Sequence, residues 1–231
     1  MKLSIAIMAV PSRRAHVDAL LDRLAAQVLR AKKRGRGASF APPMVFWDTD
    51  RAGPWHCWKG AWQARPCDAT HHAIVQDDVL VCADLPETLL RLAEARPGDP
   101  VSGFLPRRSV ELAVAADARW VSTRRFLWAQ CLLLPTSLGD AALRWIEDNE
   151  RLNPDWRRHD DSRLAAFFEA HRRQVFVAVP HPVEHVGDAI GGSVMGHHGP
   201  AAKRRARPGA WLGEEQPLGA LDWSNLQSVR E

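Results

Sequence analysis

The sequence predicts an α/β fold: a mainly parallel β-sheet flanked by helices, in a single domain that ends in an irregular C-terminal tail. Three observations lead to this prediction. Short apolar runs alternate with longer amphipathic ones from residue 3 to residue 105, which is typical of parallel strands joined by helices. One apolar run, residues 73–79, contains two adjacent aspartates near its end, where open sheets of this class bind ligands. The 231 residues also suffice to bury a sizeable core.

The first half of the chain contains the clearest elements. Its first apolar run predicts a strand, and the segment that follows has Val17, Leu20 and Leu24 on one helical face. In order, we expect a strand at residues 3–10, a helix at 14–29, a strand at 44–47, a helix at 55–64, a strand at 73–79, a helix at 86–95 and a strand at 101–105. A helix between consecutive strands favours parallel pairing.

The second half is less regular. We expect strands at residues 119–123 and 126–134, helices at 138–149 and 160–173, and a strand at 175–179. Residues 180–199 are rich in turn-forming residues, and from about residue 200 the chain is rich in proline, glycine and charge. We therefore predict a folded domain over residues 1–199 and a basic tail over residues 200–231 that docks on it or is partly disordered.

Composition is that of an ordinary globular chain. Hydrophobic residues make up 46% and charged residues 25%. No apolar stretch is long enough to span a membrane, so no membrane partner is expected. The four cysteines have no CxxC spacing, which argues for a reducing compartment, the cytoplasm, and against a structural zinc site.

Positive charge is concentrated in two segments. The net charge is +4. We define the 32–36 cluster as Lys32, Lys33, Arg34 and Arg36, and the 203–207 cluster as Lys203, Arg204, Arg205 and Arg207. Such clusters are commonly solvated loops or tails, and the alternative is a polyanionic partner such as nucleic acid.

Three short motifs contain residue types that catalysis uses. Gln76-Asp77-Asp78 ends a predicted strand, His159-Asp160-Asp161 begins a predicted helix, and Glu184-His185 follows the last predicted strand. Adjacent carboxylates repel and are costly to bury, so a cation or a group of donors is expected to face them. Each motif alone also has a structural interpretation, as an acidic turn, a helix N-cap or a hydrogen-bonded histidine. Together they supply metal ligands and a base for transfer from a diphosphate donor.

The order of these motifs resembles the nucleotide-sugar-dependent glycosyltransferases of the GT-A fold. The resemblance spans roughly residues 3–196 and begins with Pro11 after the first strand and an aspartate after the second. Gln76-Asp77-Asp78 resembles the family's metal-binding DxD element, with Gln in place of the first Asp. His159-Asp160-Asp161 resembles its xED element, and His185, followed by Gly191-Gly192-Ser193, resembles its C-terminal metal-binding histidine.

The resemblance implies a site within a GT-A-like catalytic domain. Asp161, with Asp160 beside it, would be the catalytic base, and Asp78, Asp77 and His185 would bind Mn²⁺ or Mg²⁺. The residues implied to bind the nucleotide-sugar donor, with a UDP-sugar expected first, are Pro11, Arg13, Asp48, Lys59, Trp62, Gln76 and Asp77.

The compact chain also resembles bacteriophage-encoded members of the family, some of which glycosylate hydroxymethylated bases in DNA. With the two basic clusters, this makes DNA one expected acceptor, in the cytoplasm of a host cell. Two other interpretations stay open. A nucleotidyltransferase on a similar scaffold would need a Gly-rich phosphate loop after the first strand, and residues 11–14 contain no glycine. A non-catalytic nucleic-acid-binding module would leave the acidic motifs unexplained.

Overall fold

A computed structural model describes residues 1–36, 39–126, 128–150, 159–190 and 204–231. The strands are β1 (Leu3–Ala9), β2 (Met44–Trp47), β3 (His71–Gln76), β4 (Val79–Val81), β5 (Val101–Ser102), β6 (Trp120–Thr123), β7 (Cys131–Pro135), β8 (Val175–Ala178), β9 (Val183–His185) and β10 (Ser228–Arg230). The α-helices are α1 (Arg14–Ala31), α2 (Pro54–Gln63), α3 (Leu85–Ala95), α4 (Arg108–Ala115), α5 (Thr136–Asn149) and α6 (Asp160–Ala170).

Within these residues the strands form one large mixed sheet and one small sheet. The large sheet has the order β10-β6-β8-β5-β7-β3-β1-β2, and β4 pairs with β9 in the small one. Strand β1 is parallel to both β2 and β3, and β5 is parallel to β8. Strand β7 is antiparallel to its neighbours β3 and β5. The predicted α/β class, a mainly parallel, Rossmann-like sheet flanked by helices, is confirmed.

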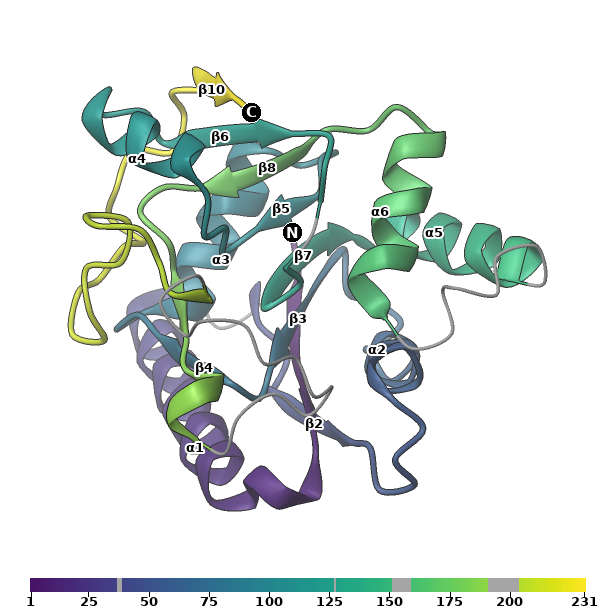
Figure 1. The fold of residues 1–231 in the computed structure, drawn as a ribbon. Helices are drawn as coiled ribbons and strands as arrows, with labels where there is room; N and C mark the ends of the chain where they lie inside the picture. The colour runs from purple at the N-terminus through teal and green to yellow at the C-terminus, as the bar shows by residue number, and fades with distance from the viewer. Residues whose placement is uncertain (37–38, 127, 151–158, 191–203) are drawn as a thin grey trace.

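Helices cover both faces of the sheet (Figure 1). Helices α1 and α3 lie on one face, where Leu24 and Leu89 are buried in a core cluster with β1. Helices α2, α5 and α6 lie on the other, where Trp58 and Phe168 are buried in a second cluster. Burial of both faces explains why the central strands are continuous apolar runs rather than alternating ones.

Four elements were not predicted: β4, α4, β9 and β10. Three of them are strands of three residues, too short to show a period. Strand β7 begins at Cys131, later than the strand predicted over residues 126–134. The residues just before it therefore leave the sheet, and three of them line the cavity described below.

The described part of the C-terminal segment packs on the domain. Leu218 and Gly219 donate backbone N–H groups to the Asp84 carboxylate, at 2.8 and 3.0 Å. The Trp223 side chain is buried, and β10 adds a strand parallel to β6 at the edge of the sheet. The domain boundary predicted at residues 199 and 200 lies outside the described residues and stays a prediction.

Two findings bear on the composition of the chain. No helix among the described residues is both long and apolar enough to cross a membrane. All four cysteines, Cys57, Cys67, Cys82 and Cys131, are free.

Candidate functional site

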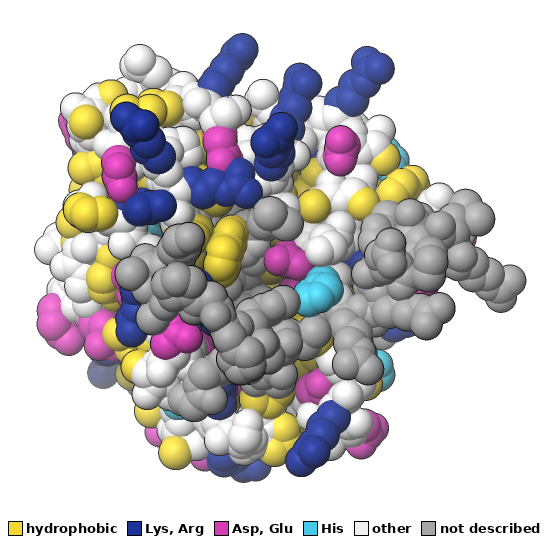
Figure 2. Space-filling view, in the orientation of Figure 1, with side chains coloured by type: hydrophobic (Ala, Val, Ile, Leu, Met, Phe, Trp, Pro, Cys, Tyr) yellow, Lys and Arg dark blue, Asp and Glu magenta, His cyan; other side chains and the backbone are white. Residues whose placement is uncertain are grey.

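A cavity of about 950 Å³ opens where β1, β2 and β3 end. Its lining includes the segments that follow these strands, the start of α6, the end of β9 and the residues before β7. In the face shown in Figure 2, acidic side chains and a histidine lie near the middle, partly beside residues that are not described. Of the sequence-predicted site residues, the cavity is lined by Pro11, Arg13, Asp48, Gln76, Asp77, Asp78, Asp160, Asp161 and His185.

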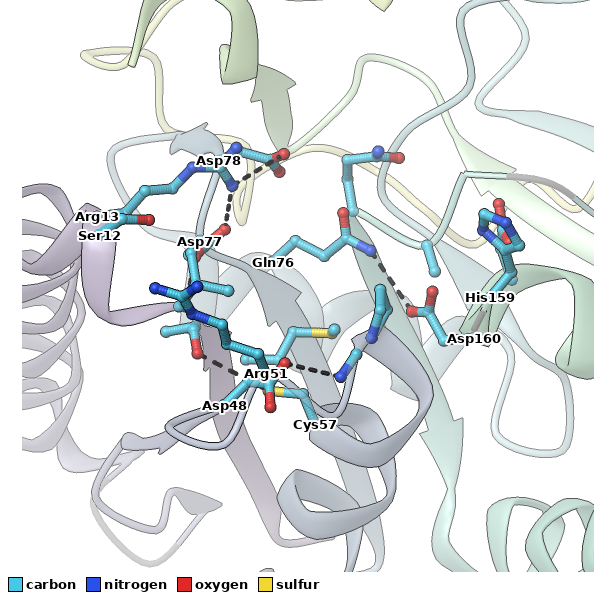
Figure 3. A pocket seen from close by; sticks show the side chains of 18 of the residues that line it. Ser12, Arg13, Asp48, Arg51, Cys57, Gln76, Asp77, Asp78, His159 and Asp160 are labelled. Atoms are coloured by element: carbon cyan, nitrogen blue, oxygen red, sulfur yellow. Dashed lines mark hydrogen bonds and ion pairs between the residues drawn. The ribbon is translucent and has the colours of Figure 1, made fainter. Parts of the chain in front are cut away.

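The end of β3 carries the first two carboxylates, Asp77 and Asp78, which we call the β3 pair. Asp77 accepts hydrogen bonds from the Arg13 guanidinium and from the Val10 backbone N–H, the latter at 2.8 Å (Figure 3). Its side chain is only 7% exposed. Burial raises the pKa of Asp77, against the opposing effect of Arg13. Both oxygens of Asp77 therefore already have partners in the protein.

Asp78 faces both a guanidinium and an imidazole. Its Oδ2 lies 3.3 Å from Nη1 of Arg13 and 3.4 Å from Nε2 of His185. Burial raises the pKa of Asp78, but the hydrogen bond and charge of His185, together with Arg13, outweigh burial and lower it. Asp78 Oδ1 is buried and has no hydrogen-bond partner among the described residues. It is an acceptor still open to a ligand.

The small sheet of β4 and β9 brings His185 to this place. Strand β4 follows Asp78 directly, and its first residue, Val79, pairs with His185 in antiparallel register. The Val186 N–H donates to the backbone carbonyl of Asp78 at 2.7 Å. Beside them, a Cβ at Gly187 would lie 2.9 Å from His185 Nε2 and 3.1 Å from Asp78 Oδ2. Glycine at this position leaves room for the imidazole next to the carboxylate.

The start of α6 carries Asp160 and Asp161, which we call the α6 pair. Asp160 is 4% exposed, and its Oδ2 accepts a long hydrogen bond of 3.5 Å from the Gln76 amide (Figure 3). Burial, together with the neighbouring charge of Asp161, raises the pKa of Asp160 to about 7. Asp161 is partly exposed, and its Oδ1 accepts the backbone N–H of Ser162 at 2.7 Å. The two aspartates of this pair thus differ in their surroundings.

The loop after β2 is organised by Asp48. Its two carboxylate oxygens accept the backbone N–H groups of Ala52 and Gly53, at 2.8 and 2.9 Å. Within this loop Arg51 has a φ of 56°, which is unusual for a residue other than glycine. Arg51 lines the cavity (Figure 3), and the described residues offer it no carboxylate within ion-pair distance. Arg51 was missed by sequence analysis, although it lies between a strand-ending Asp and a Gly-Pro helix start.

Two residues predicted to bind the donor are not brought to the cavity. Lys59 forms an ion pair with Glu147 of α5 at 3.2 Å. Trp62 is buried in the helical layer, where it stacks on Trp58 and donates its Nε1–H to Asp140 at 2.9 Å. Both side chains project from α2 toward α5, because α2 packs against α5 as well as against the sheet.

Comparison with known proteins adds a similarity of fold. No protein-family model matches the chain, and no curated protein matches its sequence. The solved structure of residues 1–349 of TarS from S. aureus is 13% identical to it, with a TM-score of 0.47. The superposition covers 77% of this chain but 58% of that one, so this chain spans less than two thirds of its neighbour. At this identity and TM-score, the likeness carries no inference about function.

Proposed function

We propose that the protein is a metal-dependent glycosyltransferase, which moves a sugar from a nucleotide-sugar donor to an acceptor hydroxyl. The observation that supports this most is that the two aspartate pairs face one cavity in different electrostatic surroundings. The β3 pair faces Arg13 and His185, as a site for a cation and a diphosphate requires. Asp160 of the α6 pair has a pKa of about 7, which suits a general base near neutral pH.

The proposed reaction is a single displacement. The acceptor oxygen forms a bond to the anomeric carbon of the sugar while the bond from that carbon to the diphosphate oxygen breaks. The nucleoside diphosphate leaves with the electrons of the broken bond, and Asp160 takes the proton of the acceptor hydroxyl. A displacement of this kind inverts the configuration at the anomeric carbon.

We assign the base to Asp160, whereas the resemblance implied Asp161. Asp160 is buried at the cavity wall, and its side-chain donor among the described residues, Gln76, is 3.5 Å away. An acceptor hydroxyl could therefore approach its oxygens. Asp161 instead accepts the N–H of Ser162, so we propose that it raises the basicity of Asp160 through its charge.

Two of the three predicted metal ligands suit Mn²⁺ or Mg²⁺. Asp78 has an unpartnered buried oxygen, and His185 Nε2 lies 3.4 Å from its other oxygen. Asp77 fits less well as a ligand, because Arg13 and Val10 occupy its oxygens. Within the described residues no group of three or more His, Cys, Asp or Glu side chains is arranged to hold an ion. A divalent ion, when bound, would offset the charge that develops on the diphosphate, and the donor's own oxygens would complete its ligand set.

The donor would lie along the ends of β1, β2 and β3. Pro11, Asp48 and Gln76 line this part of the cavity, and a UDP-sugar is the donor we propose first, on the resemblance of the sequence. Three arginines line the cavity. Arg13 neutralises the β3 pair and Arg204 pairs with Asp188, whereas Arg51 is exposed and is the cation we propose for the diphosphate. We therefore add Arg51 to the proposed donor-binding residues.

For the acceptor we propose a hydroxymethylated base in DNA, as in the bacteriophage enzymes that the sequence resembles. The reaction would then take place in the cytoplasm of the host. Support for this step comes from the basic composition of the chain alone. The donor site described above does not depend on it.

A panel of sugar nucleotides tests the proposed function. Thermal stabilisation and release of nucleoside diphosphate would be measured with Mn²⁺ and with excess chelator, using wild type and Asp160→Asn. We expect one donor to stabilise both proteins with Mn²⁺, and only wild type to release diphosphate. Pyrophosphate release from a nucleoside triphosphate would instead indicate a nucleotidyltransferase. A failure of every donor to bind would contradict the proposal.

A further inference from the structure

A second cavity lies near the other edge of the large sheet from the first one, where β6 and β10 end and β8 begins. Its volume is about 580 Å³, and its lining consists of Ser122, Thr123, Arg124, Arg125, Gln174, Arg230 and Glu231. We call it the arginine pocket. In Figure 2, Lys and Arg side chains project from the upper edge of the molecule, where Figure 1 places β6 and β10.

The register of three strands assembles this pocket from distant parts of the chain. Arg230 of β10 pairs with Ser122 of β6 in parallel register, and the Glu231 N–H donates to the Ser122 carbonyl at 3.0 Å. Thr123 pairs with Val175, the residue after Gln174. Arg124 and Arg125 follow Thr123 directly. Backbone pairing therefore brings three arginines, Arg124, Arg125 and Arg230, to the lining of one pocket.

The lining of the pocket contains three arginines and one acidic residue, Glu231. Within the described residues, Arg124, Arg125 and Arg230 have no carboxylate in ion-pair range, while nearby Arg119 is paired with Asp117 at 3.0 Å. The one carboxylate side chain in the lining, Glu231, is held by Arg107. Three cations thus share one concave surface, which is the usual setting for a bound anion.

The buried part of the lining adds hydroxyl groups. Ser122 and Thr123 are 4% and 2% exposed, and the Ser122 hydroxyl accepts a hydrogen bond from Ser228 Oγ at 3.3 Å. Thr123 Oγ1 accepts the Arg125 N–H at 2.9 Å, so its own hydroxyl hydrogen is available to donate. Arginine forks and hydroxyl donors together match the tetrahedral oxygens of a phosphate group.

The two basic clusters seen in the sequence differ from the arginine pocket. In the 32–36 cluster, Arg34 and Arg36 pair with Glu87 at 3.2 and 3.8 Å. In the 203–207 cluster, Arg204 pairs with Asp188 and Arg207 with Glu111, at 3.5 and 3.6 Å, and Lys203 lies outside the described residues. Much of the charge expected to attract a polyanion is therefore already used within the protein.

We propose that the arginine pocket binds a phosphate group, either as free phosphate or as part of a polyanionic strand. Its position adds a reason for a strand, because the segment that contributes Arg124 and Arg125 continues to Trp128, Ala129 and Gln130, which line the first cavity. Binding is independent of the transfer reaction, so the two proposals can fail separately.

The test compares two variants that each lose two charges. Arg124→Ala/Arg125→Ala removes pocket cations, and Lys32→Ala/Lys33→Ala removes exposed lysines of the 32–36 cluster. Binding of a fluorescein-labelled single strand of about 12 nucleotides is followed by anisotropy across a salt series, without donor. We expect the pocket variant to bind about tenfold more weakly, with a salt slope smaller by about 1.4, and the lysine variant to stay within about twofold of wild type. All four side chains are exposed, so the variants should fold, as circular dichroism would verify.

A second measurement identifies the source of the phosphate. Thermal stability is recorded in inorganic phosphate and in chloride at equal ionic strength, for wild type, Arg124→Ala/Arg125→Ala and Arg230→Ala. Stabilisation by phosphate that both variants lose supports a free anion as ligand. Weaker strand binding without a phosphate effect supports a polymer. If neither strand affinity nor phosphate stabilisation changes in either variant, or if the lysine variant alone binds the strand more weakly, the proposal is overturned.

Discussion

The β3 pair and the α6 pair are both Asp-Asp dipeptides whose first residues are buried to a similar degree. They differ in the charges of the side chains that face them. Asp77 is 5% exposed and Asp160 is 4% exposed, and burial raises the pKa of both. Arg13 and His185 face the β3 pair and lower the pKa of Asp78 in spite of its burial. Asp160 has a second carboxylate beside it, and burial and the charge of Asp161 raise its pKa to about 7, although backbone N–H groups and the Gln76 amide donate hydrogen bonds to it. The facing side chains, rather than the Asp-Asp sequence, thus decide whether such a pair holds cations or protons.

The largest effect on the transfer rate is expected from a substitution in the α6 pair. Asp160→Asn should lower the transfer rate by about 10³-fold, within the usual contribution of a general base, while donor binding is kept. Asp161→Asn is the matched control and should cost about tenfold at most, since Asp161 acts only through its charge. Rates with saturating donor and acceptor would check this. An equal loss in both variants would mean that the comparison assigns the base wrongly.

The next effect breaks the β3 pair. Asp78→Ala should lower activity by about 10²-fold, the size seen when one electrostatic contact to a transition state is removed. His185→Ala should weaken Mn²⁺ binding in titration calorimetry with donor present, because it removes the imidazole beside Asp78. Both changes should also lower the melting temperature, because the lowered pKa of Asp78 means that Arg13 and His185 stabilise its ionised form in the folded protein. Activity is therefore compared at a temperature well below the melting point of each variant. Full activity of wild type in excess chelator would contradict the metal assignment.

A smaller effect concerns stability and pH. Since the pKa of Asp160 is raised from the ordinary value of 3.8 to about 7, the folded state keeps a proton that the unfolded state releases between these values. The stabilisation from this proton is complete below pH 3.8 and is lost as the pH rises through 7. Asparagine does not titrate, so the stability of Asp160→Asn does not depend on this proton. Between pH 5 and pH 8 the free energy of unfolding of wild type should therefore fall by about 2 kcal/mol relative to that of the variant, which is on the order of 5 °C in Tm.

Differential scanning calorimetry at the two pH values checks this, with Asp22→Asn, on an exposed part of α1, as the control. A constant difference in Tm between Asp160→Asn and wild type would show that Asp160 is ionised in the folded protein.

The smallest effect tests the cation that sequence analysis missed. Arg51→Ala should raise the KM for the donor about tenfold, equal to about 1.4 kcal/mol, with little change in kcat. A matched control is Arg108→Ala, since Arg108 is exposed and does not line the cavity. If Arg51→Ala changed kcat and left KM as it was, Arg51 would act on the transition state and not on donor binding.

The fold was predictable where the pattern along the chain was strong. The apolar run from Leu3 and the helical face of Val17, Leu20 and Leu24 correspond to β1 and α1. The short strands β4, β9 and β10 were not predictable, because three residues carry no period and each strand depends on a partner distant in sequence. Residues 180–199 are rich in turn-forming residues, so the sequence predicts turns there, and β9 is recognised only from its pairing with β4.

The site was predictable in its residue types and not in its contacts. Two Asp pairs and His185 stood out because adjacent acids are costly to bury. That Arg13 would occupy Asp77, or that Gln76 would face Asp160, depends on how β3, α6 and the turn after β1 meet. Tertiary packing also explains why Lys59 and Trp62 do not reach the cavity: the packing of α2 against α5 directs both side chains away from it.

The pairing of β4 with β9 has a consequence for how the protein is made. Asp78 emerges from the ribosome long before His185, and only the antiparallel contact of Val79 with His185 brings them together. Until then a nascent chain holds an acidic turn with no imidazole beside it. The centre proposed here would thus mature last, after most of the sheet has been synthesised, and a chain that stops short of β9 would be an apparently well-formed scaffold with an incomplete site.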